Sequence, residues 1–373
     1  MTDASEDTEA RRAEIAATFD CDLDPLATYA EQFQNATFDS NAPFQLFLDE
    51  VLATDNPRPG TYDAYERCFR QWREHMAQRG RHPACPNEQH VLAFIESELT
   101  ERGNKPTTVK GKLRILSRVS KYWATDPAFP HPPEYNPFDI AREKATFEFR
   151  PLKEQHPIAL PTIREHIHSV THIRDQALLV VGFKLGARVT EVRNMRLEDI
   201  SLTDITLQSQ YSELGSQKEV ANHQDAIYIP SRHERSGNKS MRPRVLPIDE
   251  ELKRVLTRWL LARPTTGDPW VFLSKQRHDK LTKKAINKIW KEAFHPEFAE
   301  TEAYRPVTSH YGRHYFCTYW RIEQNLNRER IKYMRGDSLD EDVDAGETID
   351  HYLHTYYSDI EECYREHIYS LGV

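Results

Sequence analysis

The chain has 373 residues, of which 38% are hydrophobic and 29% are charged; this composition fits a globular protein and excludes a disordered or fibrous one. It contains no apolar run of about eighteen residues, so no membrane-spanning helix is expected, and its polar N-terminus lacks an apolar signal segment, which favours a cytoplasmic protein. The five cysteines are scattered without a CxxC pair, which indicates neither a disulfide framework nor a zinc site.

The net charge of −8 is unevenly distributed along the chain. Residues 1–50 hold 12 acidic residues against 2 arginines, and residues 337–373 hold 11 against 1, so residues 51–336 carry about +12. A basic middle between acidic ends is typical of a protein that binds nucleic acid. A generally charged surface explains the same distribution equally well.

The first part of the chain is predicted to be an acidic leader followed by a helical domain. Residues 1–40 are polar and acidic, and we expect them to be partly disordered. Residues 41–125 are expected to form a helical domain with one core. Its helices are predicted where apolar residues recur at helical spacing, at 44–51, 62–72, 91–99 and 109–123.

The fourth of these segments, KPTTVKGKLRILSRVSKYW, carries basic residues around its apolar stripe. Lys110, Arg114 and Arg118 are the candidates for DNA binding, because basic residues on one helix can contact phosphates without reading base sequence. A solvated helix face is the more frequent explanation for a single helix of this kind.

Residues 126–160 are rich in proline and lack a clear period, which predicts a semi-rigid linker. A second domain, residues 161–373, follows. In it ALLVVGFKLG is expected to be a buried helix that ends at Gly186, whereas DITLQ, AIYIPS and PRVLPI are predicted strands. The pattern returns to helices after Asp249. The predicted fold class is therefore mainly α with a small β-sheet (α+β).

The segment HYGRHYFCTYW gathers hydrogen-bond donors on one side of a predicted helix. His310 lies three residues before Arg313 and four before His314, so a helix presents all three together. With no carboxylate in the segment, the expected occupant is an oxyanion such as phosphate. HxxxH is also a metal-ligand spacing, but a guanidinium beside a dication adds repulsion and no ligand, so no metal is expected.

A second candidate segment is LGARVTEVRNMRLEDI. Arg188 follows Gly186, where the buried helix is expected to end, and Glu191 lies one turn later. Taken alone, this pair is more often a surface salt bridge.

In chain order, four motifs resemble those of the tyrosine recombinases (phage-integrase type). GARVTEVRNMRLEDI resembles their first arginine box and HYGRHYFCTYW their second. Between them, GNKSMRPRVLPI resembles the lysine segment, with Lys239 five residues before Arg244. TIDHYLH resembles the segment that holds the nucleophile, here Tyr352. Together, the four ordered motifs are specific to the family.

The resemblance implies a fold, a reaction and partners. The fold would pair a SAM-like core-binding domain with a catalytic domain as a C-shaped clamp on double-stranded DNA. Arg188 and Arg313 would bind the scissile phosphate, and His310 would donate or accept a proton. Tyr352 would form a 3′-phosphotyrosyl link, and Lys239 would protonate the departing 5′-hydroxyl. No metal or cofactor would be needed, and a homotetramer on DNA would exchange four strands.

The chain departs from the family pattern after the second arginine box. The family usually has Leu-Gly-His or Leu-Gly-Trp there, whereas this chain has Met334-Arg335-Gly336-Asp337. An aspartate cannot donate to phosphate as a histidine does, so Asp337 has no assigned role. The acidic stretch SLDEDVDAGE then lengthens the interval to Tyr352, and we expect it to form a flexible loop.

Several alternatives stay open from the sequence. Tyr356 and Tyr357 are the next candidates for the nucleophile, and Arg232 and Arg235 are poorer rivals of Lys239. The pair His351 and His354 is also compatible with a metal site, but hydrogen bonding within the active site is the favoured interpretation. The C-terminal apolar residues dock either on a neighbouring protomer or on their own domain: Ile360, Cys363, Ile368 and Leu371.

The rival functions are a DNA-binding protein that keeps the recombinase fold without catalysis and a type IB topoisomerase-like enzyme. A metal-dependent nuclease is disfavoured, because no carboxylate cluster lies beside the basic residues.

Overall fold

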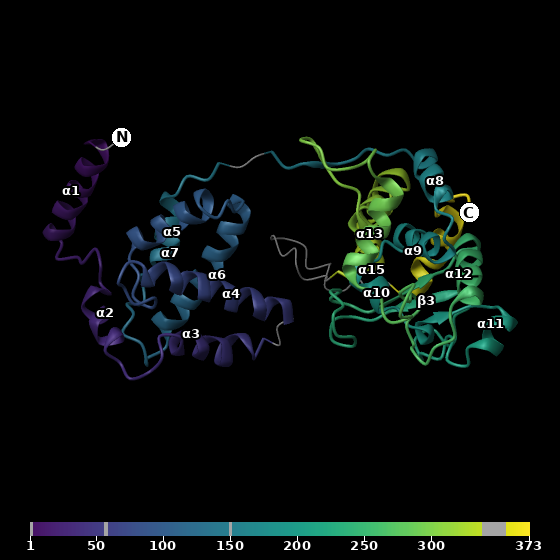
Figure 1. The fold of residues 1–373 in the computed structure, drawn as a ribbon, viewed down its shortest axis with the longest axis horizontal. Coiled ribbons are helices and arrows are strands. Elements are labelled where there is room, and N and C mark those ends of the chain that lie inside the picture. Colours follow the sequence, from purple (N-terminus) through teal and green to yellow (C-terminus); the bar gives the residue numbers. More distant parts are fainter. Residues whose placement is uncertain (1–2, 56–58, 149–150, 338–355) are drawn as a thin grey trace. The chain divides into compact units, whose positions relative to one another are not determined.

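The computed structural model describes residues 3–55, 59–148, 151–337 and 356–373 (Figure 1). They belong to two compact units, Met1–Pro151 (unit 1) and Leu152–Val373 (unit 2), and each is described by itself. Within the described residues, no helix has both the length and the apolar character needed to cross a membrane.

Unit 1 consists of helices. All four helical segments expected between residues 41 and 125 are confirmed, the first of them ending in a π-helical turn, η1. The helices of the unit are α1 (Asp3–Thr18), α2 (Ala27–Gln34), α3 (Ala42–Phe47), η1 (Leu48–Leu52), α4 (Pro59–Ala77), α5 (Glu88–Thr100), α6 (Pro106–Thr125) and α7 (Pro137–Lys144).

Aromatic side chains fill the core of unit 1, because the apolar stripes of α3 to α7 face one another. Phe44, Trp72 and Trp123 are each at most 1% exposed. The Trp72 indole donates to the Pro83 carbonyl at 2.9 Å, which satisfies the one polar atom of this buried side chain.

Two segments of unit 1 differ from the expectation. The leader, residues 1–40, contains α1 and α2, and Leu26 and Ala30 pack on Cys85. The expected linker, residues 126–160, contains α7, because Asn136 caps a helix that starts at a proline. The side chain of Phe138 in α7 is 1% exposed in the core of unit 1.

The described part of unit 2 is also mostly helical, with two small sheets, as the predicted fold class requires. Its helices are α8 (Leu160–Ser169), α9 (Ile173–Lys184), α10 (Val189–Asn194), η2 (Leu197–Asp199), α11 (Ile205–Gln210), α12 (Glu250–Ala262), α13 (Lys283–Phe294), α14 (Ser309–Thr318), η3 (Tyr319–Glu323), α15 (Arg328–Arg335), η6 (Tyr357–Asp359) and α16 (Glu361–His367). Its strands are β1 (Glu154–Gln155), β2 (Ile200–Ser201), β3 (Ala226–Ile229), β4 (Arg244–Pro247) and β5 (Tyr304–Arg305).

The larger sheet is antiparallel, in the order β2-β3-β4, with Ile227 opposite both Ile200 and Leu246. The second sheet pairs β1 with β5 in parallel. AIYIPS and PRVLPI are confirmed as strands β3 and β4. The prediction of a strand at DITLQ is wrong: the segment enters helix α11, because the Asp204 side chain caps it by accepting from the Leu207 N–H at 3.0 Å.

Helix α9 is the centre of unit 2, and α12 and α14 pack against it. Its only lysine, Lys184, is 0% exposed, and its ammonium group pairs with two carboxylates. Nζ lies 2.6 Å from Asp249 Oδ2 and 2.8 Å from Glu251 Oε2. Paired in this way, the charge can be buried beside an apolar core.

The C-terminal segment packs on its own unit. Ile360 and Leu371 are 2% and 0% exposed, and the Tyr364 hydroxyl donates to the Lys184 carbonyl at 2.7 Å. The structure therefore shows the second of the two dockings considered from the sequence, with the tail on its own domain.

Candidate active site

The first arginine box bends the chain between α9 and α10. Gly186 has φ +54°, and a Cβ there would lie 2.6 Å from a ring carbon of Phe316 in α14, so both the turn and the close packing require glycine. Arg188 is the N-cap of α10, and its N–H donates to Glu191 Oε2 at 2.9 Å. The Gly-x-Arg-x-x-Glu segment thus separates α9 from α10 and places Arg188 at the start of α10.

Glu191 contacts both Arg188 and Arg244. Its carboxylate, 0% exposed, lies 3.3 Å from Arg188 Nη1 through Oε1 and accepts from Arg244 Nη2 at 2.9 Å through Oε2. Burial works to raise the pKa of Glu191, but the charges of Arg244, Arg313 and Arg188 outweigh it and lower the pKa to about 2. Glu191 is therefore ionised at pH 7 and orients two arginines.

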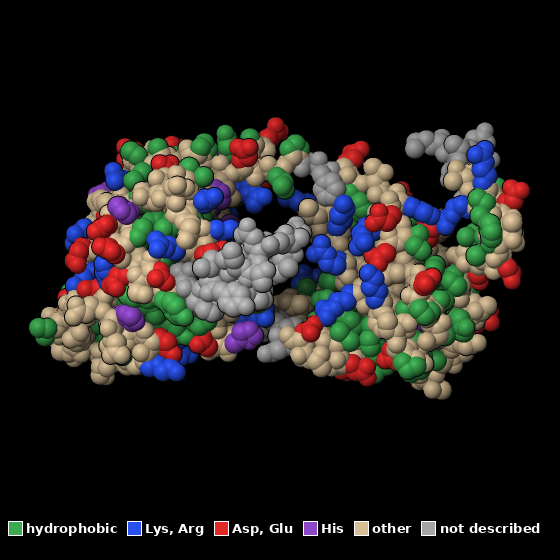
Figure 2. All heavy atoms as spheres, turned by 180° about the vertical axis from the view of Figure 1, so that it is seen from behind, with side chains coloured by type: hydrophobic (Ala, Val, Ile, Leu, Met, Phe, Trp, Pro, Cys, Tyr) green, Lys and Arg blue, Asp and Glu red, His purple; other side chains and the backbone are tan. Residues whose placement is uncertain are grey.

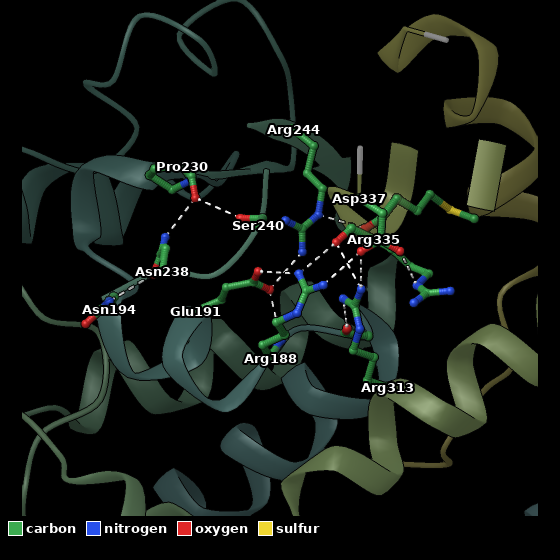
Figure 3. A network of polar contacts seen from close by, with 12 residues as sticks. Arg188, Glu191, Asn194, Pro230, Asn238, Ser240, Arg244, Arg313, Arg335 and Asp337 are labelled. Carbon is green, nitrogen blue, oxygen red and sulfur yellow. Dashed lines mark hydrogen bonds and ion pairs between the residues drawn. The ribbon is translucent and has the colours of Figure 1, made fainter. Parts of the chain in front are cut away.

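Helix α14 brings in the second arginine. Arg313 is 3% exposed; its Nη1 donates to the Gly186 carbonyl and its Nη2 to the Arg335 carbonyl, both at 3.1 Å. Arg188 Nη1 donates to the same Arg335 carbonyl at 3.3 Å. Two arginines that are 125 residues apart in the sequence thus converge at the end of α15 (Figure 3).

An aspartate of the chain itself lies between the two arginines. Asp337 Oδ1 is 2.8 Å from Arg188 Nη2 and 3.1 Å from Arg313 Nη2, while Oδ2 is 2.8 Å from Arg335 Nε (Figure 3). Asp337 had no role in the sequence analysis. In the structure its carboxylate is the anion that the two arginines bind.

His310 lies at the start of α14 with its side chain exposed. Partial burial, followed by the charges of Arg313, His314 and Arg188, lowers its pKa. His310 is therefore neutral at pH 7, with one ring nitrogen free to accept a proton and the other to donate. Arg313 lies three residues after His310 on the same helix, α14.

Lys239 is exposed on the connection between β3 and β4, and the residues on either side of it are anchored. Asn238 Nδ2 donates to the Pro230 carbonyl at 2.8 Å, and Ser240 Oγ donates to the same carbonyl at 3.3 Å. Asn194 Nδ2 at the end of α10 donates to Asn238 Oδ1 at 2.8 Å (Figure 3). The lysine segment is thus tied to the helix that Arg188 starts.

The two rivals of Lys239 have other partners. Arg235 Nη2 lies 2.9 Å from Asp199 Oδ1 and its Nη1 donates to the Asn194 carbonyl at 3.1 Å. Arg232 Nε donates to His233 Nε2 at 3.0 Å. Arg235 therefore serves as a structural residue.

The proposed nucleophile Tyr352, with His351 and His354, lies outside the described residues. Of its rivals, Tyr356 is 62% exposed. The Tyr357 hydroxyl donates to Glu361 Oε1 at 2.9 Å, and burial, then this bond, raises the Tyr357 pKa. A raised pKa disfavours the phenolate and counts against Tyr357.

The three candidate DNA-binding residues of α6 have different surroundings. Arg114 is exposed. Lys110 Nζ lies 4.8 Å from the ring centroid of Phe147, and Arg118 Nη2 lies 2.6 Å from Asp55 Oδ2. The face of unit 1 in Figure 2 carries both basic and acidic side chains.

Sequence reasoning missed Arg244 as a site residue. It is 2% exposed on β4, and its Nε donates to the Met334 carbonyl of α15 at 2.7 Å while Nη2 donates to Glu191. An arginine inside the apolar strand RVLP was the available signal, because a buried guanidinium requires acceptors.

A second missed group surrounds a cavity of about 490 Å³ whose lining includes Trp270, Lys280, Arg196 and Arg235. Lys280 Nζ lies 3.4 Å from the Trp270 ring centroid. Burial, followed by three neighbouring arginines, lowers the pKa of Lys280 to about 8.

Comparison with known families favours one of the interpretations of this geometry. Residues 157–338 match the model described as the phage integrase family. This part of the chain resembles that family. The members of this family are tyrosine-type site-specific recombinases. The matched residues contain Arg188, Lys239, His310 and Arg313, and they end before Tyr352.

Solved structures show the same fold at low sequence identity. The chain is similar to Tn1549 transposon integrase in complex with a circular intermediate DNA, with a TM-score of 0.56 and 17% identity over 79% of this chain and 91% of that one. It is also similar to a lambda integrase tetramer bound to a Holliday junction, with a TM-score of 0.55 and 15% identity over 91% and 88%. No curated protein matches the sequence.

Proposed function

We propose that this protein is a site-specific DNA recombinase that cuts and rejoins double-stranded DNA through a covalent 3′-phosphotyrosine, without a metal or other cofactor. The observation that supports it most is the convergence of Arg188 and Arg313 on one carboxylate oxygen, at 2.8 and 3.1 Å. A non-bridging oxygen of a phosphodiester offers the same charge and the same acceptor geometry.

The arginines would supply the electrostatic part of catalysis. In the pentacoordinate transition state, negative charge accumulates on the non-bridging oxygens of the phosphate. Arg188 and Arg313 are oriented beforehand by Glu191 and by the Gly186 carbonyl, so their dipoles need not reorganise when the charge appears. This fixed orientation is what a metal ion would otherwise provide.

The remaining residues would move protons. The phenolic oxygen of Tyr352 attacks phosphorus, a P–O bond to tyrosine forms, and the P–O bond to the 5′-oxygen breaks. The phenolic proton moves to neutral His310, and the Lys239 ammonium donates a proton to the departing 5′-oxygen. The link conserves the energy of the phosphodiester, so a 5′-hydroxyl of a second strand can reverse the attack and complete the exchange.

Strand exchange between two sites needs four active centres, so we propose that monomers assemble as a homotetramer on DNA. Lys110, Arg114 and Arg118 of unit 1 would contact backbone phosphates and complete a clamp around the duplex. The protein would act in the cytoplasm.

A nicked suicide duplex tests this function. The duplex would carry the direct repeat expected in the DNA that flanks the gene, so that loss of a short 5′ fragment traps the covalent complex. We expect an adduct that resists SDS with the native protein and with Tyr356→Phe, and none with Tyr352→Phe. An adduct that persists in Tyr352→Phe contradicts the assignment of the nucleophile.

A second candidate function is DNA binding without cleavage, which the position of Asp337 favours because its carboxylate already occupies the arginine pair. In that case the same duplex is retarded in a mobility-shift assay, and no adduct forms with any variant.

A further inference from the structure

The proposed phosphate-binding arginines are already bound to an anion in the protein alone. Asp337 Oδ1 is shared between the Nη2 atoms of Arg188 and Arg313, and the Arg335 carbonyl accepts a second hydrogen bond from each (Figure 3). One oxygen between two guanidinium groups is the arrangement that a phosphate oxygen would make.

The backbone holds Asp337 at this position. Helix α15 ends at Gly336, with φ +66°, and the Asp337 N–H donates back to the Lys332 carbonyl at 3.1 Å. A Cβ on residue 336 would lie 2.5 Å from Arg244 Nη1 and 2.9 Å from the Arg242 carbonyl, so glycine is required. The backbone of Asp337 is therefore fixed in position, and its carboxylate lies directly beside the arginines.

The charges explain why some anion must be present. Arg313 is 3% exposed, and burial, followed by the charges of Arg188 and Arg244, lowers its pKa. Glu191 supplies one negative charge to these three guanidinium groups, and Asp337 supplies a second. A phosphate at the position of Oδ1 could replace Asp337 but not share the site with it, because two anions in contact repel each other.

We propose that Asp337 is an internal competitor of the scissile phosphate: its carboxylate fills the phosphate-binding position in the DNA-free protein, and a phosphodiester must displace it before cleavage. This proposal rests on the proposed function of the arginine pair. The cost of displacement weakens binding of every DNA site by the same factor, so at a DNA concentration that still fills a matched site a poorly matched site stays largely unoccupied. Under such conditions Asp337 biases cleavage toward the matched site.

Binding of inorganic phosphate to the full chain tests the competition without DNA cleavage. Titration calorimetry would compare the native protein with Asp337→Asn, which removes the charge but keeps the shape. We expect phosphate to bind about tenfold tighter to Asp337→Asn, within the range typical of coupling between competing ligands. Equal or weaker binding in the folded variant overturns the proposal.

Matched controls separate this competition from a general charge effect. Glu329→Gln removes one negative charge from α15, where Glu329 Oε1 lies 3.6 Å from Lys332 Nζ, and we expect no change in phosphate affinity. An equal gain in this control contradicts the proposal. If Asp337→Asn does not fold, as circular dichroism would show, Asp337→Ser provides the same test with the same expected direction.

The suicide duplex distinguishes failure of this inference from failure of the proposed function. At a duplex concentration that saturates the matched site in both proteins, we expect Asp337→Asn to narrow, by about tenfold, the ratio of adduct formed on the matched site to adduct on a scrambled site. An unchanged ratio in an active variant overturns the specificity role. If phosphate affinity rises but no protein forms an adduct, the competition stands and the proposed recombinase function fails.

Discussion

Basic residues are used differently in the two units. In unit 1, Arg118 lies near the surface with its Nη2 2.6 Å from Asp55, and its neighbours on α6 follow the face of a single helix. In unit 2, Arg188 and Arg313 come from distant helices and meet at one carboxylate, where Arg313 is only 3% exposed. Convergence and burial, rather than the number of basic residues, therefore mark the candidate active site.

The largest expected effect comes from changing the fork of one site arginine. Arg188→Lys keeps the positive charge but loses the paired Nη atoms that reach Asp337 and the Arg335 carbonyl. We expect the rate of adduct formation on the suicide duplex to fall by about 100- to 1,000-fold, as when one preorganised donor is removed. Arg321→Lys, on an exposed residue of η3, is the matched control, and an equal loss there would break the comparison between the units.

The next effect is on stability. Glu191→Gln leaves Arg244, 2% exposed, without its anionic partner, and the expected loss in free energy of unfolding is about 3–5 kcal/mol. Urea denaturation measures it. Asp55→Asn breaks an ion pair at the surface of unit 1 and should cost at most about 1 kcal/mol. A similar loss of unfolding free energy in the two variants would contradict the distinction between the buried ion pair of unit 2 and the surface ion pair of unit 1.

The dependence of stability on acidic pH also reports the ion pairs of Glu191. The pKa of Glu191 is lowered from its ordinary 4.5 to about 2, so between these values the unfolded chain binds more protons than the folded one. The contribution of Glu191 is therefore present above pH 4.5 and is lost as the pH falls toward 2. Urea midpoints between pH 5 and pH 3 should fall less steeply in Glu191→Gln; equal slopes would contradict the assignment.

A smaller effect separates two residues of α6. Arg114 is exposed, so Arg114→Gln should weaken duplex binding and lower the slope of log affinity against log salt by about 1. Arg118 already lies beside Asp55, so Arg118→Gln should change the slope less. Fluorescence anisotropy across a salt series measures both variants. A larger change for Arg118 would show that its ion pair gives way to DNA.

The smallest effect concerns Lys280 near Trp270. Its pKa is lowered from 10.5 to about 8, so between these values the unfolded chain binds more protons and stability rises with pH. We expect the melting temperature of the native protein to increase slightly relative to that of Lys280→Gln as the pH rises from 8 to 10. A variant that follows the native curve would show that Lys280 is not perturbed in the folded chain.

Much of the fold could be predicted from residue patterns, and its failures have local causes. The apolar stripes of α4, α5 and α6 were sufficient, because each helix buries one face. DITLQ alternates like a strand, but the cap from Asp204 and the burial of Leu207 make it helix α11. Helix α7 was not predicted, because its segment is rich in proline; proline nevertheless fits the first turn of a helix, where α7 has it.

The sequence motifs pointed to a set of candidate residues but not to their arrangement. Spacing identified Arg188 and Arg313, and the structure brings them to one anion. Spacing could not show that Asp337 is this anion or that Arg244 ties Glu191 to α15, because both depend on contacts between distant segments. Tyr352 stays a prediction from the sequence motif.

A methylphosphonate substrate gives the most direct test that the arginine pair neutralises a phosphate. Replacing one non-bridging oxygen at the scissile position with a methyl group removes the charge that Arg188 and Arg313 are proposed to bind. We predict that Arg188→Ala forms almost no adduct on the normal suicide duplex but recovers adduct formation on the methylphosphonate duplex. An equal loss on both substrates, in a folded variant, would contradict the account.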